Sequence, residues 1–320
     1  MLGLSLGRQV GPREVPVEAL RNILVLMEPG AEAQPAFDAA LLLARQFGAR
    51  LELLMSDYQD LHAAYFSSPS ATVQEFHDAV MSAHRAVLEK YTKRAASGVP
   101  AICEALWGTP FHEIVLGRVA ATRPDLVVKH SVHHNRIERT LFTGSDWHLI
   151  RECPVPLLLV KAPDRLVGQR ILVCVDPLHA HDKPAVLDHR LLRTAALLAG
   201  PLEGEVHALH VFSVPTPVAV VGDAYIAAAA VPPADATVAA STVAFRQLLA
   251  VHAVPAERAH LSVGAPARDI LAEARKLDAG LVIMGAVSRG RLDRWFVGNT
   301  AEAVLDRLSC NVWVEKPRAA

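Results

Sequence analysis

The chain has 320 residues, of which 52% are hydrophobic and 20% are charged, and its formal net charge is −1. This length suits two domains of about 150 residues each, and the hydrophobic content excludes a chain that is disordered throughout. The balanced charge argues against a nucleic-acid partner or a polybasic membrane contact. We expect neither a signal peptide nor a membrane span, because no stretch approaches the roughly 20 apolar residues that a membrane helix needs. The four cysteines show no CxxC spacing, which favours a reducing cytoplasm over a disulfide scaffold.

Apolar runs that predict strands alternate along the first half with amphipathic stretches that predict helices. The expected order is a strand at 23–27, a helix at 33–48, a strand at 51–57, a helix from about 73 to 96, a strand at 101–107, a helix, a strand at 125–130, a helix, and a strand at 156–161. Gly48 suits a helix stop, and Pro110 suits the first turn of the helix that follows it.

The second half repeats this order. We expect strands at 171–175, 205–212, 259–264, 280–285 and 311–316, with helices over about 186–199, 236–252 and 267–276 and another before the last strand. Strands that are apolar on both faces and alternate with helices indicate a parallel sheet covered on both sides. Each half is therefore predicted to be an α/β domain with a doubly wound, five-stranded parallel sheet.

Internal similarity between the halves indicates a duplication. Three segment pairs match in the same order, with offsets of 148, 156 and 157 residues: ILVLMEP at 23–29 with ILVCVDP at 171–177, WGTPFHEI at 107–114 with VGAPARDI at 263–270, and ECPVPLLLVK at 152–161 with SCNVWVEK at 309–316. Chance similarity of apolar strands would not keep this order and spacing. We expect an N-terminal extension at 1–18, a first domain at 19–163 and a second domain at 164–320.

Acidic and glycine residues follow the expected strands of the second half. In open parallel sheets, ligands bind beyond the carboxyl ends of the strands, where the strand order reverses. Asp176 follows the first strand, Gly285 ends the fourth, and Gly298-Asn299-Thr300 opens the last helix. Glycine lets the backbone approach an anion, and free N–H groups at a helix start bind phosphate. These residues also have a purely structural explanation, since Asn and Thr are good helix caps and an aspartate suits a turn.

These residues resemble the nucleotide motif of the universal stress protein family, G-x2-G-x9-G-(S/T). Gly285 matches the first glycine and Gly298 the third, whereas Ser288 replaces the second. Asn299-Thr300 stand where the motif continues, and Asp176 matches the family's acidic residue after the first strand. The resemblance implies an adenine nucleotide alpha hydrolase-like fold, with Asp176 facing the nucleoside and the other residues holding phosphate through backbone N–H groups. It also implies ATP with Mg²⁺ as the cofactor.

The resemblance covers almost the whole chain. FTGSDWHLIRECP in the first half and FVGNTAE in the second are most similar to the tandem, E-type members of the family. For that type it implies two domains packed as an internal pseudo-dimer, with the last strands, in CPVPLLLVK and CNVWVEK, paired across the interface. A further homodimer stays open. By resemblance, the role is stress response in a bacterial cytoplasm, exerted through a small-molecule ligand or a partner.

The first half departs from the motif. Glu28 stands in place of the aspartate, and His130, His133 and His134 replace glycines in the loop at 128–147. Side chains that occupy glycine conformations cost energy, so the phosphate cradle of this half is predicted to be degenerate.

The same three histidines, with His148 nearby in sequence, are weak candidates for a metal site. Zinc needs ligands that converge from several positions, and no cysteine pair supports one here. We expect no metal, and interpret the three histidines as a polar loop or as contacts to an anionic ligand. Asp146-Trp147-His148 resembles a catalytic pair, but adjacent helix residues point to different faces, so we interpret Ser145 or Asp146 as an N-cap.

Enzyme signatures are absent: the chain has no Walker A GxxxxGK(S/T), no GxGxxG after a first strand and no HExxH. We therefore expect a protein that is not an enzyme. Two alternatives remain, namely a weak ATP hydrolase at the same site and a binding module for a lipid-like or sugar-nucleotide ligand. The long apolar segment at 214–237 would form an interface, a ligand cover or a structural lid.

Overall fold

The computed structural model describes residues 20–57, 73–131, 133–134, 139–140, 144–178, 185–214, 234–286 and 299–317. The first half contains β1 (Asn22–Met27), α1 (Pro35–Phe47), β2 (Arg50–Asp57), α3 (Val73–Ala95), β3 (Ala101–Trp107), α4 (Phe111–Thr122), β4 (Leu126–His130), β5 (His133–His134), β6 (Arg139–Thr140), α5 (Gly144–Glu152) and β7 (Leu157–Val160). After the short helix η1 (Pro163–Arg165), the second half contains β8 (Arg170–Val175), α6 (Ala185–Ala199), β9 (Glu205–Phe212), α7 (Ala234–Val251), η3 (Ala256–Arg258), β10 (Ala259–Val263), α8 (Pro266–Lys276), β11 (Leu281–Gly285), α9 (Asn299–Leu305) and β12 (Asn311–Glu315). Strands and helices alternate as predicted, except for the short strands β5 and β6, which lie where a loop was predicted.

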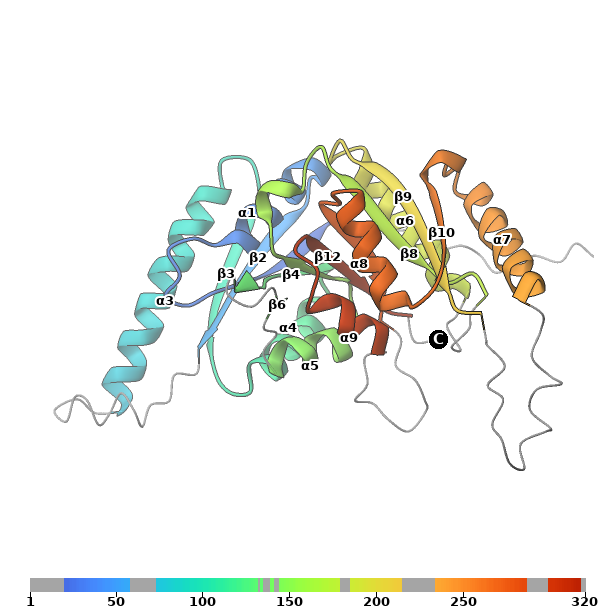
Figure 1. Cartoon of the computed structure of the whole chain (residues 1–320). Coiled ribbons are helices and arrows are strands. Elements are labelled where there is room, and N and C mark those ends of the chain that lie inside the picture. The colour runs from blue at the N-terminus through green and yellow to red at the C-terminus, as the bar shows by residue number, and fades with distance from the viewer. Residues whose placement is uncertain are drawn as a thin grey trace, which may run out of the picture.

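Ten of the described strands form one sheet in the order β10-β9-β8-β11-β12-β7-β4-β1-β2-β3 (Figure 1). Within each half the strands are parallel, and the fourth strand of the half lies between its first and its last. β12 and β7 meet antiparallel, with Trp313 opposite Leu158. The predicted α/β fold with a mostly parallel sheet is therefore confirmed, and so is the pairing of the last strands across the two halves.

Helices cover both faces of this sheet because its strands are apolar on both sides. Successive strand residues point to opposite faces, so Ile23 and Val25 belong to one core and Leu24 and Leu26 to the other, all at most 2% exposed. α1, α3, α6 and α7 contribute to the first core, and α4, α5, α8 and α9 to the second (Figure 1). Burial of each such side chain contributes about 1.5–3 kcal/mol, which drives both helical layers onto the sheet.

α1 shows how the sequence determines the ends and the packing face of an element. Pro35 occupies the first turn, where its missing N–H costs no helical hydrogen bond. Gly48 ends the helix in the left-handed conformation, with φ at 66°, and its N–H donates to the carbonyl of Ala44. Ala36, Ala40 and Ala44 follow each other at four-residue spacing and are all buried. Small side chains on this stripe let the helix pack close to the sheet, and the predicted stop at Gly48 is confirmed.

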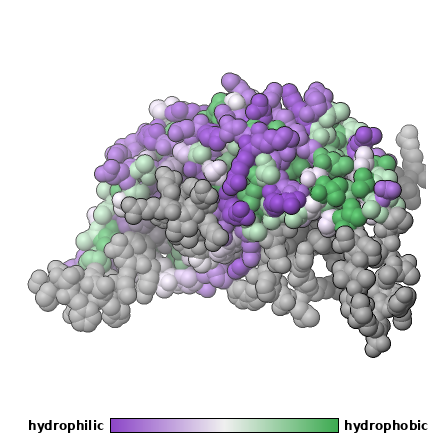
Figure 2. Space-filling model, viewed as in Figure 1, coloured by the Kyte–Doolittle hydropathy of each residue, from purple (hydrophilic) through white to green (hydrophobic). Residues whose placement is uncertain are grey.

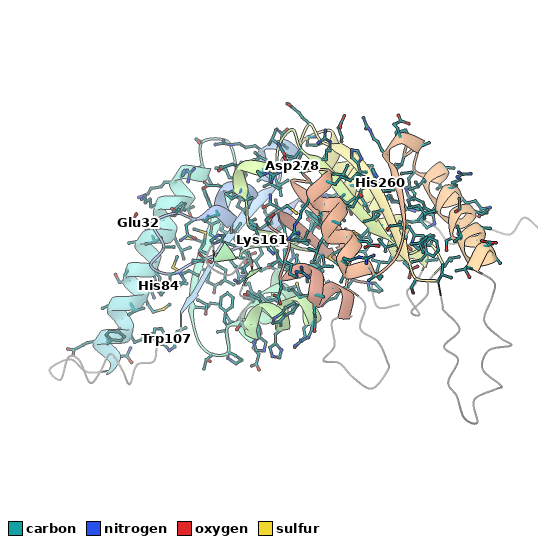
Figure 3. The ribbon with its side chains drawn as sticks, viewed as in Figure 1. Glu32, His84, Trp107, Lys161, His260 and Asp278 are labelled. Carbon is teal, nitrogen blue, oxygen red and sulfur yellow. The ribbon has the colours of Figure 1, made fainter. Side chains whose placement is uncertain are left out.

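Polar side chains hold the junction between the two halves. Asn311 at the start of β12 is 0% exposed, and its Oδ1 accepts hydrogen bonds from the backbone N–H of Lys161 and of Ala162, each at 3.0 Å. Lys161, labelled in Figure 3, donates through Nζ to the carbonyl oxygens of Leu305 at 2.6 Å and Leu308 at 2.8 Å, at the end of α9. These contacts tie the chain that leaves β7 to the second half, so the order of β7 and β12 does not depend on apolar packing alone.

Hydrophobic side chains reach the surface at the β10 end of the sheet (Figure 2). Val243 and Val251 of α7 and Leu261 and Val263 of β10 are exposed. β10 is an edge strand of the large sheet, and an edge with exposed apolar side chains is a surface that proteins often bury in contacts.

Two predicted segments fall largely outside the described residues. These are the N-terminal extension at 1–18 and the apolar segment at 214–237, of which only Val214 and the first turn of α7 are described. In the described ranges, no helix is both long enough and apolar enough to cross a membrane.

Candidate functional site

The carboxyl ends of β8 and β11 lie side by side where the strand order of the second half reverses. β8 pairs with β9 on one side and with β11 on the other, and the last paired residues of β8 and β11 are Val173 and Ile283. Asp176 and Gly285 follow these positions at the same edge of the sheet. A crevice at such a reversal is where open α/β sheets hold their ligands. The structure thus brings these two predicted site residues together.

The end of β8 is fixed by side chains from neighbouring elements. The backbone N–H of Asp176 donates to Oδ1 of Asp188 at 3.0 Å, and Asp188, in the first turn of α6, is 1% exposed. His210 of β9, also 1% exposed, has its Nδ1 atom 3.2 Å from the carbonyl oxygen of Val175. Asp176 itself is half-buried. Neither Asp188 nor His210 was among the residues predicted from the sequence, although an aspartate among the apolar positions of a predicted helix often indicates a buried polar contact.

Gly285 also has a packing reason to be glycine. A Cβ atom added there would lie 2.8 Å from Cδ2 of Leu187 and 3.8 Å from Cδ1 of Leu191, both on α6. The missing side chain therefore lets α6 pack against the end of β11. This contact accounts for the glycine without any ligand, so Gly285 supports the nucleotide prediction less than its match to the motif indicates.

The other predicted phosphate contacts lie at the edge of the described residues or beyond it. Ser288 and Gly298 are outside the described ranges. Asn299 and Thr300 are the first two residues of α9, where the sequence predicted a helix start. Their roles toward phosphate stay predictions.

A buried carboxylate that the sequence did not predict lies next to this edge. Glu315 ends β12 and is 2% exposed. Its carboxylate contacts Nη2 of Arg190 at 2.9 Å and accepts hydrogen bonds from Thr194 Oγ1 at 2.5 Å and from Trp313 Nε1 at 3.0 Å. Its carbonyl oxygen accepts the N–H of Ala286 at 2.8 Å. Glu315 therefore joins α6 to the residue that follows β11, at the carboxyl-end edge of the sheet.

The equivalent edge of the first half is closed by a pair of side chains. Glu28 follows β1 and His130 ends β4, at the positions of Asp176 and Gly285, and Nδ1 of His130 lies 3.0 Å from Oε2 of Glu28. Gln34 accepts the N–H of Glu28 at 2.9 Å and donates to its carbonyl oxygen at 2.7 Å. In both halves a side chain from the next helix region therefore binds the residue after the first strand, and in the first half an imidazole also contacts the acid.

Two other sequence-based interpretations are affected by the structure. α5 begins at Gly144, so Ser145 and Asp146 are its second and third residues, and the prediction that one of them is the N-cap is wrong. Asp146 is buried instead, and its Oδ1 lies 2.7 Å from Nζ of Lys129 at the end of β4. Of the weak metal candidates, His130 contacts Glu28, while His133 and His134 form β5, which pairs antiparallel with β6.

Comparison with known proteins places the chain in a family. The model of the universal stress protein family matches residues 19–161 and again residues 168–316. The chain belongs to the universal stress protein family. The two matches correspond to the two five-stranded halves of the sheet, so the duplication seen in the sequence is a repeat of this domain.

Similar proteins cover nearly the whole chain. Universal stress protein E of Salmonella typhi is 30% identical over 306 residues, which cover 93% of this chain and 94% of that protein. Among solved structures, a functionally unknown Pseudomonas aeruginosa protein has a TM-score of 0.73 at 24% identity and covers 94% of both chains. A universal stress protein from Archaeoglobus fulgidus has a TM-score of 0.60 at 17% identity and covers 93% of this chain and 98% of its own. The two structures show the shared fold, and family membership supports a role in stress response.

Proposed function

We propose that this universal stress protein acts in a bacterial cytoplasm by binding a small-molecule ligand at the carboxyl ends of β8 and β11. ATP with Mg²⁺ is the first candidate. The contrast between the halves carries this proposal: the first half pairs Glu28 with His130 across the strand ends, whereas the second half has Asp176 beside Gly285. The position that His130 occupies in the first half is therefore a glycine in the second half, next to the Asp176 carboxylate.

The described residues fit the nucleoside end of such a ligand. A half-buried carboxylate at a strand end accepts hydrogen bonds from ribose hydroxyls or from an amino group of the base. Asp176 would have this role. Backbone N–H groups at Gly285, Ser288, Gly298 and Asn299-Thr300 would hold the phosphates, and Mg²⁺ would neutralise part of their charge.

We propose binding without turnover. Hydrolysis of a phosphate ester requires a base positioned beside the attacking water. Two buried carboxylates near the crevice have other contacts: Asp188 accepts the N–H of Asp176, and Glu315 contacts Arg190 and two hydrogen-bond donors. These two carboxylates hold strand ends in place and would not act as the base. The protein would therefore act through the presence or absence of the bound ligand, and through any partner that responds to it.

Mass spectrometry of small molecules released from the natively purified, then denatured, protein tests this proposal directly. We expect adenine nucleotide near one per chain. Asp176→Ala and Gly298→Val should each remove it, because they delete the nucleoside contact and fill the phosphate loop. Glu28→Gln is the matched control, since it changes the equivalent acid of the first half, and it should retain the nucleotide.

Thermal unfolding with added MgATP gives the second measurement. A ligand at about 100 times its Kd stabilises the native state by about 2.7 kcal/mol, a shift of several degrees in Tm for a chain of this size. An empty protein without a thermal shift would refute nucleotide binding. A retained ligand without adenine would favour the lipid-like or sugar-nucleotide alternative, and Mg²⁺-dependent phosphate release that Asp176→Ala abolishes would favour a weak hydrolase.

A further inference from the structure

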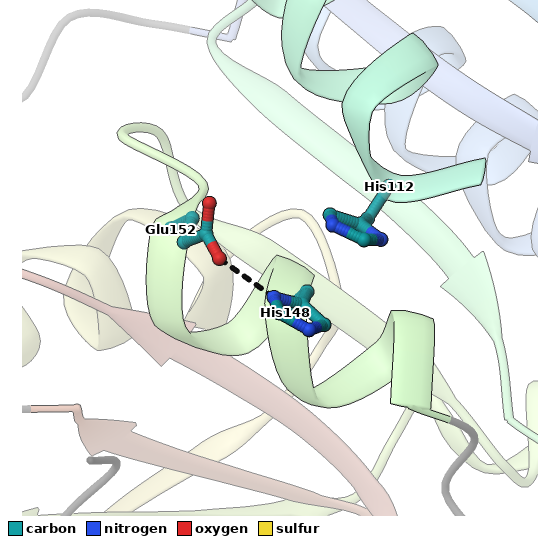
Figure 4. Close-up of side chains that lie close together, drawn as sticks. All are labelled: His112, His148 and Glu152. Carbon is teal, nitrogen blue, oxygen red and sulfur yellow. Dashed lines mark hydrogen bonds and ion pairs between the residues drawn. The ribbon is translucent and has the colours of Figure 1, made fainter. Parts of the chain in front are cut away.

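Two helices of the first half bring His112, His148 and Glu152 together (Figure 4). His112 is the second residue of α4, which packs against α5. His148 and Glu152 are four residues apart on α5, so both lie on one face of that helix. One potential ligand atom from each of the three residues lies within 4.8 Å of the other two. Within the described ranges, this is the single group of three or more histidine, cysteine and acidic residues with that geometry.

The three side chains are already oriented toward one another. Nδ1 of His148 lies 2.7 Å from Oε1 of Glu152, and the rings of His112 and His148 stack with their centroids 4.0 Å apart and their planes 8° apart. The side chains of His148 and Glu152 are 27% and 35% exposed, so an ion can reach them from water. The Nδ1 atom of His112 is buried and has no hydrogen-bond partner among the described residues, so no contact at that atom holds the ring in place.

The charges at this place favour a cation. Metal coordination uses neutral imidazoles, each of which offers one nitrogen lone pair. Glu152 supplies a negative charge and is also the last residue of α5, where the carbonyl groups at a helix end add partial negative charge. A divalent ion would therefore meet one carboxylate, two neutral nitrogen ligands and the negative end of a helix.

We propose that His112, His148 and Glu152 bind a divalent transition-metal ion. Two imidazole nitrogens and one carboxylate oxygen, at about 2.0–2.2 Å from the metal, are the ligand set of zinc sites that keep a fourth position for water. The same set suits Fe²⁺. To coordinate one ion, the stacked rings must turn so that their in-plane nitrogen lone pairs and the Glu152 oxygen point at the same position. The site lies between α4 and α5 of the first half, apart from the crevice of the second half, and is independent of the nucleotide proposal.

Titration of the full-length, metal-free protein with Zn²⁺, followed by calorimetry, tests the site. We expect one tightly bound Zn²⁺ per chain. His112→Ala and Glu152→Gln should each lower its affinity by at least about tenfold, since loss of even a supporting ligand contact has an effect of this size. The chain has 15 histidines, so a control for adventitious binding is needed. His189→Ala serves as this control, because His189 contacts His252 at 2.8 Å elsewhere in the protein, and this variant should bind like the wild type.

Glu152→Gln is the decisive variant because it keeps the size of the side chain and replaces a residue at the surface. Co²⁺ provides a second readout, since an ion held by these ligands absorbs visible light, and this absorption should disappear in Glu152→Gln. Far-UV circular dichroism identifies any variant that has not folded. Unchanged Zn²⁺ affinity in folded His112→Ala and Glu152→Gln would overturn the proposal. So would the absence of Zn²⁺ binding by the wild type, which would leave the stacked rings and the ion pair as a helix-packing contact.

Discussion

Two buried lysines at the junction of the halves predict that the protein becomes more stable as the pH rises above 8. Lys161 follows β7 and Lys316 follows β12, so the antiparallel pair of these strands places them at opposite ends of the junction. Burial lowers the pKa of each ammonium group from 10.5 to about 8. Between these values the unfolded chain keeps protons that the native chain has released. Unfolding therefore takes up protons, and the free energy of unfolding increases with pH.

The size of this increase follows from the same pKa values. From pH 8 to about pH 9, the native state goes from about half to about nine-tenths deprotonated at each lysine, which adds about 1 kcal/mol per lysine. Buried thiols act in the opposite direction. Burial raises the pKa of Cys310 to about 11, and burial also raises the pKa of Cys153, so the native chain keeps protons that unfolded thiols lose. Because an unfolded thiol with a pKa of 9.0 goes only from about one-tenth to about half ionised in this interval, the thiols offset part of the gain, and we expect a net gain of about 1–2 kcal/mol.

Urea unfolding at pH 8 and at about pH 9, with a metal chelator present, measures this effect. Lys161→Met and Lys316→Met should each remove about half of the increase. The neutral amine of Lys161 still has N–H groups for the carbonyl oxygens of Leu305 and Leu308, so deprotonation does not break these contacts. A free energy of unfolding that stays constant or falls over this interval in the wild type would show that the two ammonium groups are not held in a low-dielectric environment, and would refute the reasoning.

Three further predictions test contacts in the second half of the large sheet. Arg190→Met leaves the Glu315 carboxylate, 2% exposed, without its cationic partner and should cost about 3–5 kcal/mol in urea unfolding; a loss below about 1 kcal/mol would contradict this assignment. Gly285→Ala places a Cβ 2.8 Å from Leu187 and should cost about 1–3 kcal/mol, less than additively with Leu187→Ala in a double-mutant cycle; full additivity would mean that the two positions do not touch. Burial lowers the pKa of His207 below 6.5, so the native state favours the neutral ring, and stability should fall as the pH drops below about 6.5. His207→Gln should make the urea midpoint less sensitive to pH between about 7 and 5, and an unchanged sensitivity would assign the effect to other groups.

Much of the fold could be predicted because its determinants are local. Apolar runs of strand length, helical periodicity and stop signals such as Gly48 act within a few residues, and the observed elements begin and end close to the predicted positions. The internal similarity of the sequence also predicted that the two halves have the same fold. The edge at which Asp176 and Gly285 lie also followed from the sequence, because the carboxyl ends of parallel strands share one edge.

The candidate site was harder to predict because its contacts join residues that are far apart in the chain. Glu28 and His130 are separated by 102 positions. Arg190 donates to the carbonyl oxygen of Lys316, which follows β12, and these two residues are separated by 126 positions. The packing of Leu187 against Gly285 is likewise invisible in a motif, which treats the glycine as a phosphate contact. Periodicity says which face of a helix is apolar, but it does not say which residue of another element lies against it.

The sequence by itself therefore determined the alternation of strands and helices, the two repeats and their family, since these depend on short-range patterns and on similarity. Only the tertiary structure decided that the last strands of the repeats meet antiparallel and in which register, which acidic groups are held by arginine or histidine, and that His112 meets His148 and Glu152 between two helices. The physical reason is that burial and distance set the strength of electrostatic and coordination contacts, and both are properties of the folded chain.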